Sequence, residues 1–198
     1  MKVVLATKNP GKLKELQELA AGDLDLELVL APDSFDPEET GATFMENAVI
    51  KAKEAALATG LHAVADDSGI EVEALGGRPG IHSARYCEGT DADRRLKLLL
   101  EVKASRSSNR SAAFVCAMAF CSPAGEVLHC VEKRWEGRLQ DWESGANGFG
   151  YDPIFYVEEM KRTSAEMTME EKNQLSHRAK AWRAMSRYMH ESQQQDGY

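Results

Sequence analysis

The chain has 198 residues and a mass of 21.9 kDa, a length that fits one domain or one domain with two lobes. Lysine and arginine number 24 and aspartate and glutamate 32, so the formal net charge is −8. An acidic chain without a long basic run is a poor candidate for a broad polyanion-binding surface, and we expect no nucleic-acid partner. No apolar run approaches the roughly 20 residues that span a bilayer, so we expect no membrane association and a cytoplasmic location.

The hydrophobic pattern of the first half of the chain alternates between strands and helices. A capping box at Thr43–Glu46 opens a helix that ends near Gly60, and a short buried strand over 63–65 follows it. The other predicted elements are strands over 2–7, 24–31, 112–121 and 127–139, and helices over 12–20 and 91–103. The last two strands are joined by Pro123-Ala124-Gly125 and are predicted to form a hairpin.

Strands that alternate with helices, followed by a late hairpin, predict an α/β fold with a mixed, twisted β-sheet flanked by helices. A second capping box at Thr168–Glu171 opens a helical C-terminal region. No internal repeat or linker divides the chain, so we expect a single domain over 1–192 and a flexible tail over 193–198. The four cysteines form no C-x-x-C pair, which favours free thiols over a metal site.

The first candidate site is Thr7-Lys8-Asn9-Pro10-Gly11-Lys12, between the first predicted strand and the first predicted helix. Backbone amides at a helix N-terminus favour an anion, and Lys12 adds a full positive charge. The pattern lacks the G-x-x-x-x-G-K-[ST] of a Walker A loop. Alone, it fits either a plain strand-to-helix turn or a phosphate site.

The second candidate site is Asp66-Asp67-Ser68-Gly69, where the apolar strand over 63–65 is expected to end. Two adjacent carboxylates in a partly dry setting repel each other unless a cation neutralises them. Ligands of open α/β sheets gather beyond the carboxyl ends of the strands, where both this motif and the first loop are expected to lie. The pattern fits a capped turn or, alternatively, a hard-metal site or a general base.

An acidic loop over 32–41 contains Asp36, Glu38 and Glu39. A solvated loop is the ordinary interpretation of such a charge run. The loop gains a function only if it folds over Asp67 and supplies an oxygen ligand to Mg²⁺.

A glycine-rich stretch with aromatic residues runs over 145–153. Glycines let a backbone approach a ligand closely. Phe149 can stack on a flat ring, as aromatic side chains do with unpaired bases, and Asp152 can accept hydrogen bonds. The alternative is a hairpin-like turn with a buried Phe149, and the spacing does not match the G-x-G-x-x-G of a dinucleotide site.

The last candidate site contains Lys172, His177 and Arg178. In one unbroken helix, these three side chains would fan out in about three directions and would be surface charges. If Ser176 caps a new helix, the bend can bring all three to one pocket. Cations in the first turn of a helix oppose its dipole, which a bound anion or a keto-bearing ligand would explain.

Taken in order, these stretches resemble the inosine triphosphate pyrophosphatase family, which acts on non-standard purine nucleoside triphosphates. The matching stretches are Thr7–Lys12, Thr43–Ala48, Ala65–Gly69, Leu75–Gly80, Ser83–Tyr86, Gly148–Phe155 and Ser164–Arg178. The resemblance implies a two-lobed α/β fold with the active site in a central cleft, and a homodimer. It also implies Mg²⁺-dependent hydrolysis of ITP, dITP and XTP between the α- and β-phosphates, which gives monophosphate and pyrophosphate and cleanses the nucleotide pool.

The resemblance assigns roles residue by residue. Asp67 is expected to be the proton acceptor that activates water and also a metal ligand, and Glu38, or its neighbour Glu39, is expected to be the second metal carboxylate. Asp66 is expected to support this cluster, and Phe149 to stack on the base. The other substrate-binding residues are expected to be Thr7, Lys8, Asn9, Pro10, Gly11, Lys12, Ser68, Gly150, Tyr151 and Lys172, with Asp152, His177 and Arg178 around the edge of the base.

Two other functions stay open on the sequence. A pyrophosphatase for modified pyrimidine nucleotides, on a related fold, would differ in the substrates it hydrolyses. A non-catalytic nucleotide-binding protein would be expected to lack a catalytic carboxylate or a phosphate-binding lysine. Asp66, Asp67, Lys12 and Lys172 are all present, which favours an enzyme.

Overall fold

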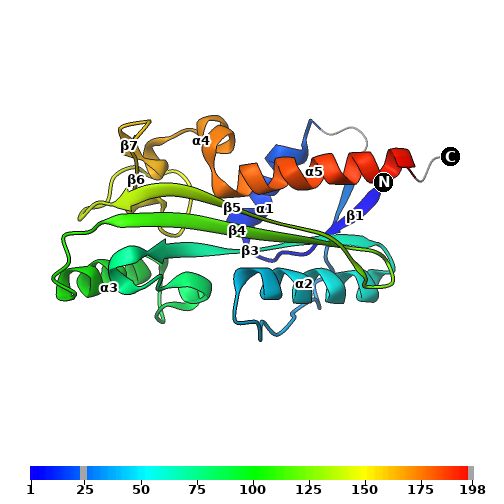
Figure 1. The fold of residues 1–198 in the computed structure, drawn as a ribbon, viewed down its shortest axis with the longest axis horizontal. Helices are drawn as coiled ribbons and strands as arrows, with labels where there is room; N and C mark the ends of the chain where they lie inside the picture. The colour runs from blue at the N-terminus through cyan, green and yellow to red at the C-terminus, as the bar shows by residue number, and fades with distance from the viewer. Residues whose placement is uncertain (23–25, 196–198) are drawn as a thin grey trace. The chain divides into compact units, whose positions relative to one another are not determined.

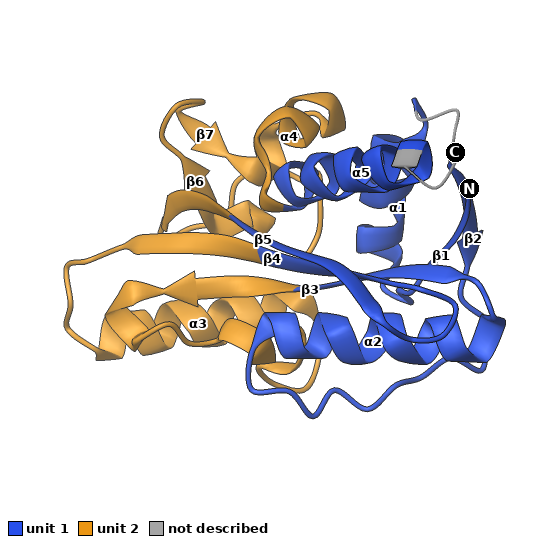
Figure 2. Cartoon of the chain, turned by 45° about the vertical axis from the view of Figure 1, so that its right-hand side comes forward, with its two compact units in different colours: residues 1–67, 116–133, 178–198 blue, residues 68–115, 134–177 orange. Residues whose placement is uncertain are grey.

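The computed structural model describes residues 1–22 and 26–195 and divides into two compact units (Figure 2). Unit 1 comprises Met1–Asp67, Cys116–Lys133 and Arg178–Tyr198, and unit 2 comprises Ser68–Val115 and Arg134–His177. The helices and strands in chain order (Figure 1) are β1 (Lys2–Leu5), α1 (Pro10–Ala20), β2 (Glu27–Leu30), α2 (Phe44–Thr59), β3 (His62–Val72), α3 (Asp91–Ala104), β4 (Ser111–Cys121), β5 (Val127–Leu139), β6 (Phe155–Val157), β7 (Arg162–Thr163), α4 (Met169–Leu175) and α5 (His177–Gln195).

The strands form one seven-stranded sheet in the order β2-β1-β3-β4-β5-β6-β7. β1 pairs in parallel with β2 and with β3, whereas β6 pairs in an antiparallel manner with β5 and with β7. The turn between β4 and β5 is closed by hydrogen bonds of 2.9 Å from Ser122 N to Glu126 O and from Gly125 N to Ser122 O. The predicted α/β fold with a mixed sheet and a late hairpin is therefore confirmed.

In unit 1, α1 and α5 cover one face of the strands and α2 covers the other (Figures 1 and 2). α1 begins at Pro10, where the Asn9 side chain caps the first turn. α2 begins after Thr43, whose hydroxyl accepts the Glu46 amide at 3.1 Å, and ends at Gly60 with a left-handed φ of 67°. The core on the α1 and α5 side consists of Val3, Leu5, Leu16, Ala20, Leu26, Val64, Cys116, Met118, Phe120, Ala181, Trp182, Met185 and Met189.

Unit 2 has a hydrophobic core of its own. α3 begins after Thr90, which forms a complete capping box with Asp93, and α4 begins after Thr168, which forms one with Glu171. α4 ends before Ser176 and α5 begins after it. The C-terminal region therefore bends at Ser176, as the interpretation with a new helix after Ser176 predicted, and is not one unbroken helix. The core residues are Ile70, Val72, Leu75, Leu98, Val102, Ala112, Phe114, Trp135, Leu139, Tyr151, Ile154, Phe155, Val157 and Met167.

The largest departure from the prediction is the length of β3. The sequence predicts a strand over 63–65 that ends at the polar stretch beginning with Asp66, whereas β3 runs without a break from His62 to Val72. Ile70 and Val72 are fully buried, so the apolar pattern resumes after the polar residues. Asp66 and Asp67 therefore lie inside a strand, and the expectation that they lie beyond its carboxyl end is wrong. The reason is that cationic side chains of the same unit compensate the buried carboxylates.

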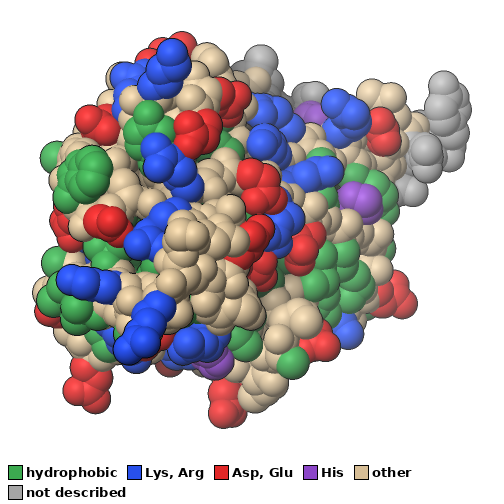
Figure 3. All heavy atoms as spheres, turned by 60° about the vertical axis from the view of Figure 1, so that its left-hand side comes forward, with side chains coloured by type: hydrophobic (Ala, Val, Ile, Leu, Met, Phe, Trp, Pro, Cys, Tyr) green, Lys and Arg blue, Asp and Glu red, His purple; other side chains and the backbone are tan. Residues whose placement is uncertain are grey.

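The remaining boundaries lie close to the prediction. β2 is confined to Glu27–Leu30, and residues 24 and 25 of the predicted strand lie outside the described residues. α5 continues to Gln195, and residues 196–198 of the predicted tail also lie outside them. On the face in Figure 3, basic and acidic side chains are intermixed.

Among the helices of the described residues, none is both long enough and apolar enough to cross a membrane.

Leu98 and Leu100 lie on the same helix, α3, but Leu98 is fully buried whereas Leu100 is 56% exposed. We expect Leu98→Ala to lower the free energy of unfolding by about 2–5 kcal/mol, because it removes core contacts and leaves a cavity. Leu100→Ala, the matched control, is expected to change it by at most about 0.5 kcal/mol. Equilibrium unfolding of both variants in urea measures the difference, and equal losses would contradict the packing of α3.

Candidate active site

The loop between β1 and α1 leads into the first turn of α1, which carries Lys12. Thr7 Oγ1 accepts the Asn9 amide at 3.2 Å, and Asn9 Oδ1 accepts the amides of Gly11 and Lys12 at 3.0 and 3.1 Å. Asn9 thus already satisfies two of the amides that were expected to face an anion. The positive charge next to these amides is the ammonium of Lys12 in the first turn of α1, whose Nζ lies 3.1 Å from Asp66 Oδ2.

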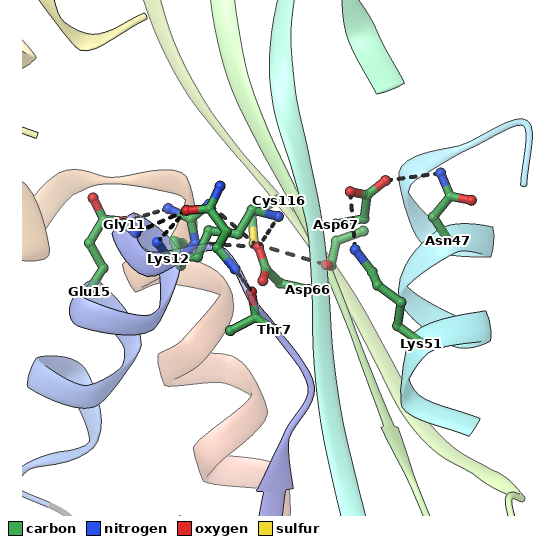
Figure 4. Close-up of polar contacts among 12 residues, drawn as sticks. Thr7, Gly11, Lys12, Glu15, Asn47, Lys51, Asp66, Asp67 and Cys116 are labelled. Atoms are coloured by element: carbon green, nitrogen blue, oxygen red, sulfur yellow. Dashed lines mark hydrogen bonds and ion pairs between the residues drawn. The ribbon is translucent and has the colours of Figure 1, made fainter. Parts of the chain in front are cut away.

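Asp66 projects from β3 toward α1 and is almost completely buried (Figure 4). Its Oδ2 lies 3.4 Å from both Nε and Nη2 of Arg178, in addition to its contact with Lys12. Arg178 in turn forms a very close ion pair with Glu15 of α1. Burial alone would raise the pKa of Asp66, but the positive charges around it, first those of Lys12 and Arg178, outweigh burial and hold the pKa well below its ordinary value.

Asp67 projects from the opposite face of β3, toward α2 (Figure 4), because successive side chains of a strand alternate. Its Oδ1 lies 3.4 Å from Lys51 Nζ, and its Oδ2 accepts from Asn47 Nδ2 at 3.1 Å. Lys51 also binds Glu39, with 2.6 Å between Nζ and Oε1. Burial raises the pKa of Asp67 above its ordinary value, and the charge of Lys51 offsets this only in part. Asp67 is therefore suited to take up a proton.

The acidic loop places Glu39 close to Asp67. Glu39 shares the ammonium of Lys51 with Asp67. Glu38 is exposed. Asp36 of the acidic loop lies 4.0 Å from Nζ of Lys8, another predicted substrate-binding residue, which lies at the surface.

The carboxylates of unit 1 have the chemistry of a magnesium site without forming a closed cage. In the described part of the chain, no three His, Cys, Asp or Glu side chains converge as a metal-binding group. Mg²⁺ needs only one or two protein carboxylates, because water and substrate phosphates complete its coordination. Glu39 and Asp67, bridged by Lys51, supply such a pair of hard oxygen donors. Asp66 Oδ1 is a further buried carboxylate oxygen with no hydrogen-bond partner among the described residues.

In unit 2, the glycine-rich loop holds an aromatic ring beside a cation. Asp152 is buried, and its Oδ2 lies 2.5 Å from Lys172 Nζ and accepts the Phe149 amide at 2.9 Å. Its Oδ1 accepts the hydroxyl of Ser164 at 2.7 Å. Lys172 Nζ lies 5.2 Å from the centroid of the Phe149 ring. Asp152 thus fixes the backbone of Phe149 and the ammonium of Lys172 in one place.

The three predicted residues around the bend at Ser176 have different partners. Lys172 contacts the glycine-rich loop, as described above. His177 is buried in unit 2, where its ring stacks on Phe114 with 4.9 Å between centroids. Arg178 belongs to unit 1 and is buried in its carboxylate network. The bend itself is confirmed, and the common role of the three residues stays a prediction.

Three further predicted residues, Ser68, Tyr151 and Gly150, lie in β3 or in the glycine-rich loop. Ser68 follows Asp67 within β3 and is partly buried. The hydroxyl of Tyr151 donates to the carbonyl of Ser83 at 2.8 Å. The backbone of Gly150 contacts α3 through both its amide and its carbonyl.

The sequence did not identify three polar residues of the networks around Asp66 and Asp67. These are Glu15, which binds Arg178, and Asn47 and Lys51, which bind Asp67. Asn47 and Lys51 are buried on the alanine-rich face of α2. Polar residues four positions apart share a helix face, so this pair among buried alanines was a usable signal for a polar site. Burial alone would lower the pKa of Lys51, but the carboxylates around it, first Asp67, raise it above its ordinary value.

The chain matches known proteins over most of its length. The model of the Ham1 family matches residues 3–188. A dITP/XTP pyrophosphatase from Pectobacterium atrosepticum is 50% identical over 191 residues, which cover 93% of this chain and 95% of that protein. One from a Nostoc species is 48% identical over 183 residues, which cover 92% and 91%. Among solved structures, a HAM1 protein from Coxiella burnetii gives a TM-score of 0.87 at 44% identity and covers 96% of this chain and 99% of that one.

Asp66→Asn removes the buried carboxylate that Lys12 and Arg178 share. We expect it to lower the free energy of unfolding at neutral pH by about 3 kcal/mol, because it leaves buried cations without their partner. Since the pKa of Asp66 lies below its value in the unfolded chain, this loss is fully present above about pH 4 and shrinks as the pH falls further. Chemical denaturation of both proteins at a series of pH values measures it.

The control for this experiment is Asp141→Asn. Asp141 is exposed and lies 3.4 Å from Arg110 Nε, so it makes a surface pair. The control is expected to change the free energy of unfolding by less than about 1 kcal/mol. An Asp66→Asn protein as stable as its control would contradict the charge network.

Proposed function

Because the chain belongs to the Ham1 family, we propose that it is a pyrophosphohydrolase for non-standard purine nucleoside triphosphates. The reaction cleaves the α–β phosphoanhydride of ITP, dITP or XTP, yields monophosphate and pyrophosphate, and cleanses the nucleotide pool. The observation that carries the proposal is that the two adjacent carboxylates on β3 have different environments. Asp66 binds two cations, whereas Asp67 binds Lys51 and has a pKa raised by burial. The homodimer that the resemblance implies and the cytoplasmic location that the sequence predicts are part of the same proposal.

We assign the triphosphate to the loop before α1. Lys12 can move its ammonium from Asp66 to a phosphate oxygen without leaving Asp66 unpaired, because Arg178 also binds that carboxylate. Asn9 uses its Oδ1 to cap α1, which leaves its side-chain NH₂ group for the ligand. A lysine and an amide donor at the start of a helix suit a polyanion, and Thr7 completes the loop.

Asp67 is assigned as the base that accepts a proton from the attacking water. Burial makes its carboxylate more basic than one at the surface. Lys51 opposes this effect and favours the ionised form that a base must have, and Asn47 fixes the orientation of the group through Oδ2. A base is most effective when its pKa lies near the working pH.

Mg²⁺ fits the same carboxylates, and we assign Asp67 and Glu39 to it, with Glu38 as the neighbouring alternative. Lys51 lies 2.6 Å from Glu39 Oε1 and 3.4 Å from Asp67 Oδ1, so it holds both groups at one place. When bound there, Mg²⁺ supplies stabilisation of the negative charge on the phosphates.

The purine ring of the substrate is assigned to Phe149 and its surroundings in unit 2. Hypoxanthine and xanthine carry a 6-keto acceptor where adenine carries an amino donor. A donor at the base edge therefore favours the keto purines, since a buried donor facing an amino group is left unpaired. His177 is the donor we favour, because Arg178 is already held by Glu15 and Asp66.

The test is pyrophosphate release from ITP, dITP, XTP, GTP, ATP and dUTP at alkaline pH, with Mg²⁺ or with a chelator. We expect metal-dependent release that is strongest with ITP, dITP and XTP. Asp67→Asn is expected to lower kcat by about 10²–10⁴-fold, because it removes the base. Asp141→Asn, with the same chemical change at the surface, is expected to match the wild type.

Four outcomes would contradict this assignment. Release of single phosphate, or equal rates with the keto purines and ATP, would exclude the proposed reaction or its specificity. A preference for dUTP would favour a pyrimidine pyrophosphatase. Tight nucleotide binding without turnover would favour a non-catalytic binding protein.

Lys51→Gln tests the electrostatic control of Asp67. The positive charge of Lys51 lowers the pKa of Asp67, so its removal should raise that pKa. Because the base acts only when ionised, the acidic limb of the pH profile of kcat/KM for ITP should move to higher pH by about one pH unit. Lys53→Gln, at an exposed position of the same helix, is the control and should leave the limb in place. An unmoved limb in Lys51→Gln would contradict the assignment of the base.

A further inference from the structure

The loop that carries Phe149 is held by α3 through both backbone groups of one glycine. The amide of Gly150 donates to Asp91 Oδ2 at 2.9 Å, and the carbonyl of Gly150 accepts from Arg95 Nη1 at 2.7 Å. Gly150 has a φ of +60°, a left-handed conformation that glycine adopts without strain. The first turns of α3 therefore fix the backbone of the residue that directly follows Phe149.

Arg95 also binds the residue at the other end of this segment, Glu143. Its Nε and Nη2 lie 2.8 and 3.0 Å from the two carboxylate oxygens of Glu143, so the pair is bidentate. Nη1 is the donor that binds Gly150. One planar guanidinium thus joins both ends of the segment 143–150. The ammonium of a lysine lacks this fork of donors and could not bind both ends in the same geometry.

The middle of the segment is attached elsewhere in unit 2 by neutral hydrogen bonds. The carbonyl of Ser144 accepts the hydroxyl of Thr163 at 2.7 Å, and the amide of Asn147 donates to the carbonyl of Ala165 at 2.9 Å. The contacts of Arg95 are charge-assisted, and its side chain is only 11% exposed, so water and salt screen it less than a surface charge. Loss of Arg95 should therefore loosen the Gly150 end, which keeps only the amide contacts of Gly150 with Asp91 and of Phe149 with Asp152, while the Ser144–Asn147 part stays attached.

We propose that Arg95 is a positioning residue for base binding: by holding Glu143 and Gly150, it fixes the ring of Phe149 where the purine stacks. The inference rests on the proposed function, because it takes Phe149 as the stacking residue. Arg95 acts through the loop and touches no reacting atom. Its effect should therefore fall on the binding of the base and spare both the pyrophosphate part of the ligand and the chemical step.

The test compares Arg95→Ala with Arg134→Ala, which removes another arginine–glutamate pair of unit 2, the contact of 2.7 Å between Arg134 and Glu71. For each protein we would measure the affinity for IMP, inhibition by inorganic pyrophosphate, and KM and kcat for ITP. Arg95→Ala is expected to weaken IMP binding and raise KM by about tenfold or more, with kcat and pyrophosphate inhibition within about twofold of the wild type. Arg134→Ala is expected to match the wild type throughout.

Two more readouts separate positioning from a loss of fold. Amide hydrogen exchange in Arg95→Ala should become faster over 148–151 and stay unchanged in β4, because only the loop is released. Arg95→Lys keeps a positive charge and one donor group, so it should recover part of the lost IMP affinity.

Unchanged IMP affinity in Arg95→Ala would overturn the inference and leave the proposed function intact. An equal weakening of IMP and pyrophosphate binding would also overturn it, since a general loss of structure would then be the cause. A wild-type protein that binds IMP but does not hydrolyse ITP would overturn the proposed function alone, because IMP binding still reports on Arg95.

Discussion

Two adjacent carboxylates lie on one strand, and the alternation of side chains along that strand sends them to opposite faces of the sheet. Asp66 faces α1 and α5, where Lys12 and Arg178 bind it, and Asp67 faces α2, where Lys51 binds it (Figure 4). Burying two carboxylates is tolerable only because each meets its own cations. The same pairing lets β3 continue through a polar stretch, and it ties three helices of unit 1 to one strand.

The two faces give the two carboxylates different chemistry. On one side, cations outweigh burial and lower the pKa of Asp66, so at neutral pH it is an anion that organises Lys12 and Arg178. On the other side, burial outweighs a single lysine and raises the pKa of Asp67. Neighbouring titratable groups whose environments push their pKa values apart mark acid and base roles. In the proposed enzyme, this division lets one residue hold the phosphate-binding cations while its neighbour exchanges a proton.

How much the sequence predicted depends on how far apart the interacting residues lie. Thr43 and Thr168 open helices as expected, because capping acts over three or four residues. The full length of β3 was not predictable, since the cations that stabilise Asp66 come from α1 and α5. Lys51 was missed although its spacing from Asn47 on the alanine-rich face of α2 was a usable signal, and only the fold shows that it meets Asp67. In the acidic loop, Glu39 shares the ammonium of Lys51 with Asp67, a contact that depends on a loop conformation which spacing alone does not define.

The central claim is that the environments of Asp66 and Asp67 split their pKa values in opposite directions. Carboxyl ¹³C NMR of the metal-free protein, assigned with Asp66→Asn and Asp67→Asn and titrated with acid, measures both groups separately. The account predicts that Asp67 titrates above, and Asp66 below, the value of about 3.9 of an unperturbed aspartate. Two similar titrations near that value, or the reverse order, would contradict it.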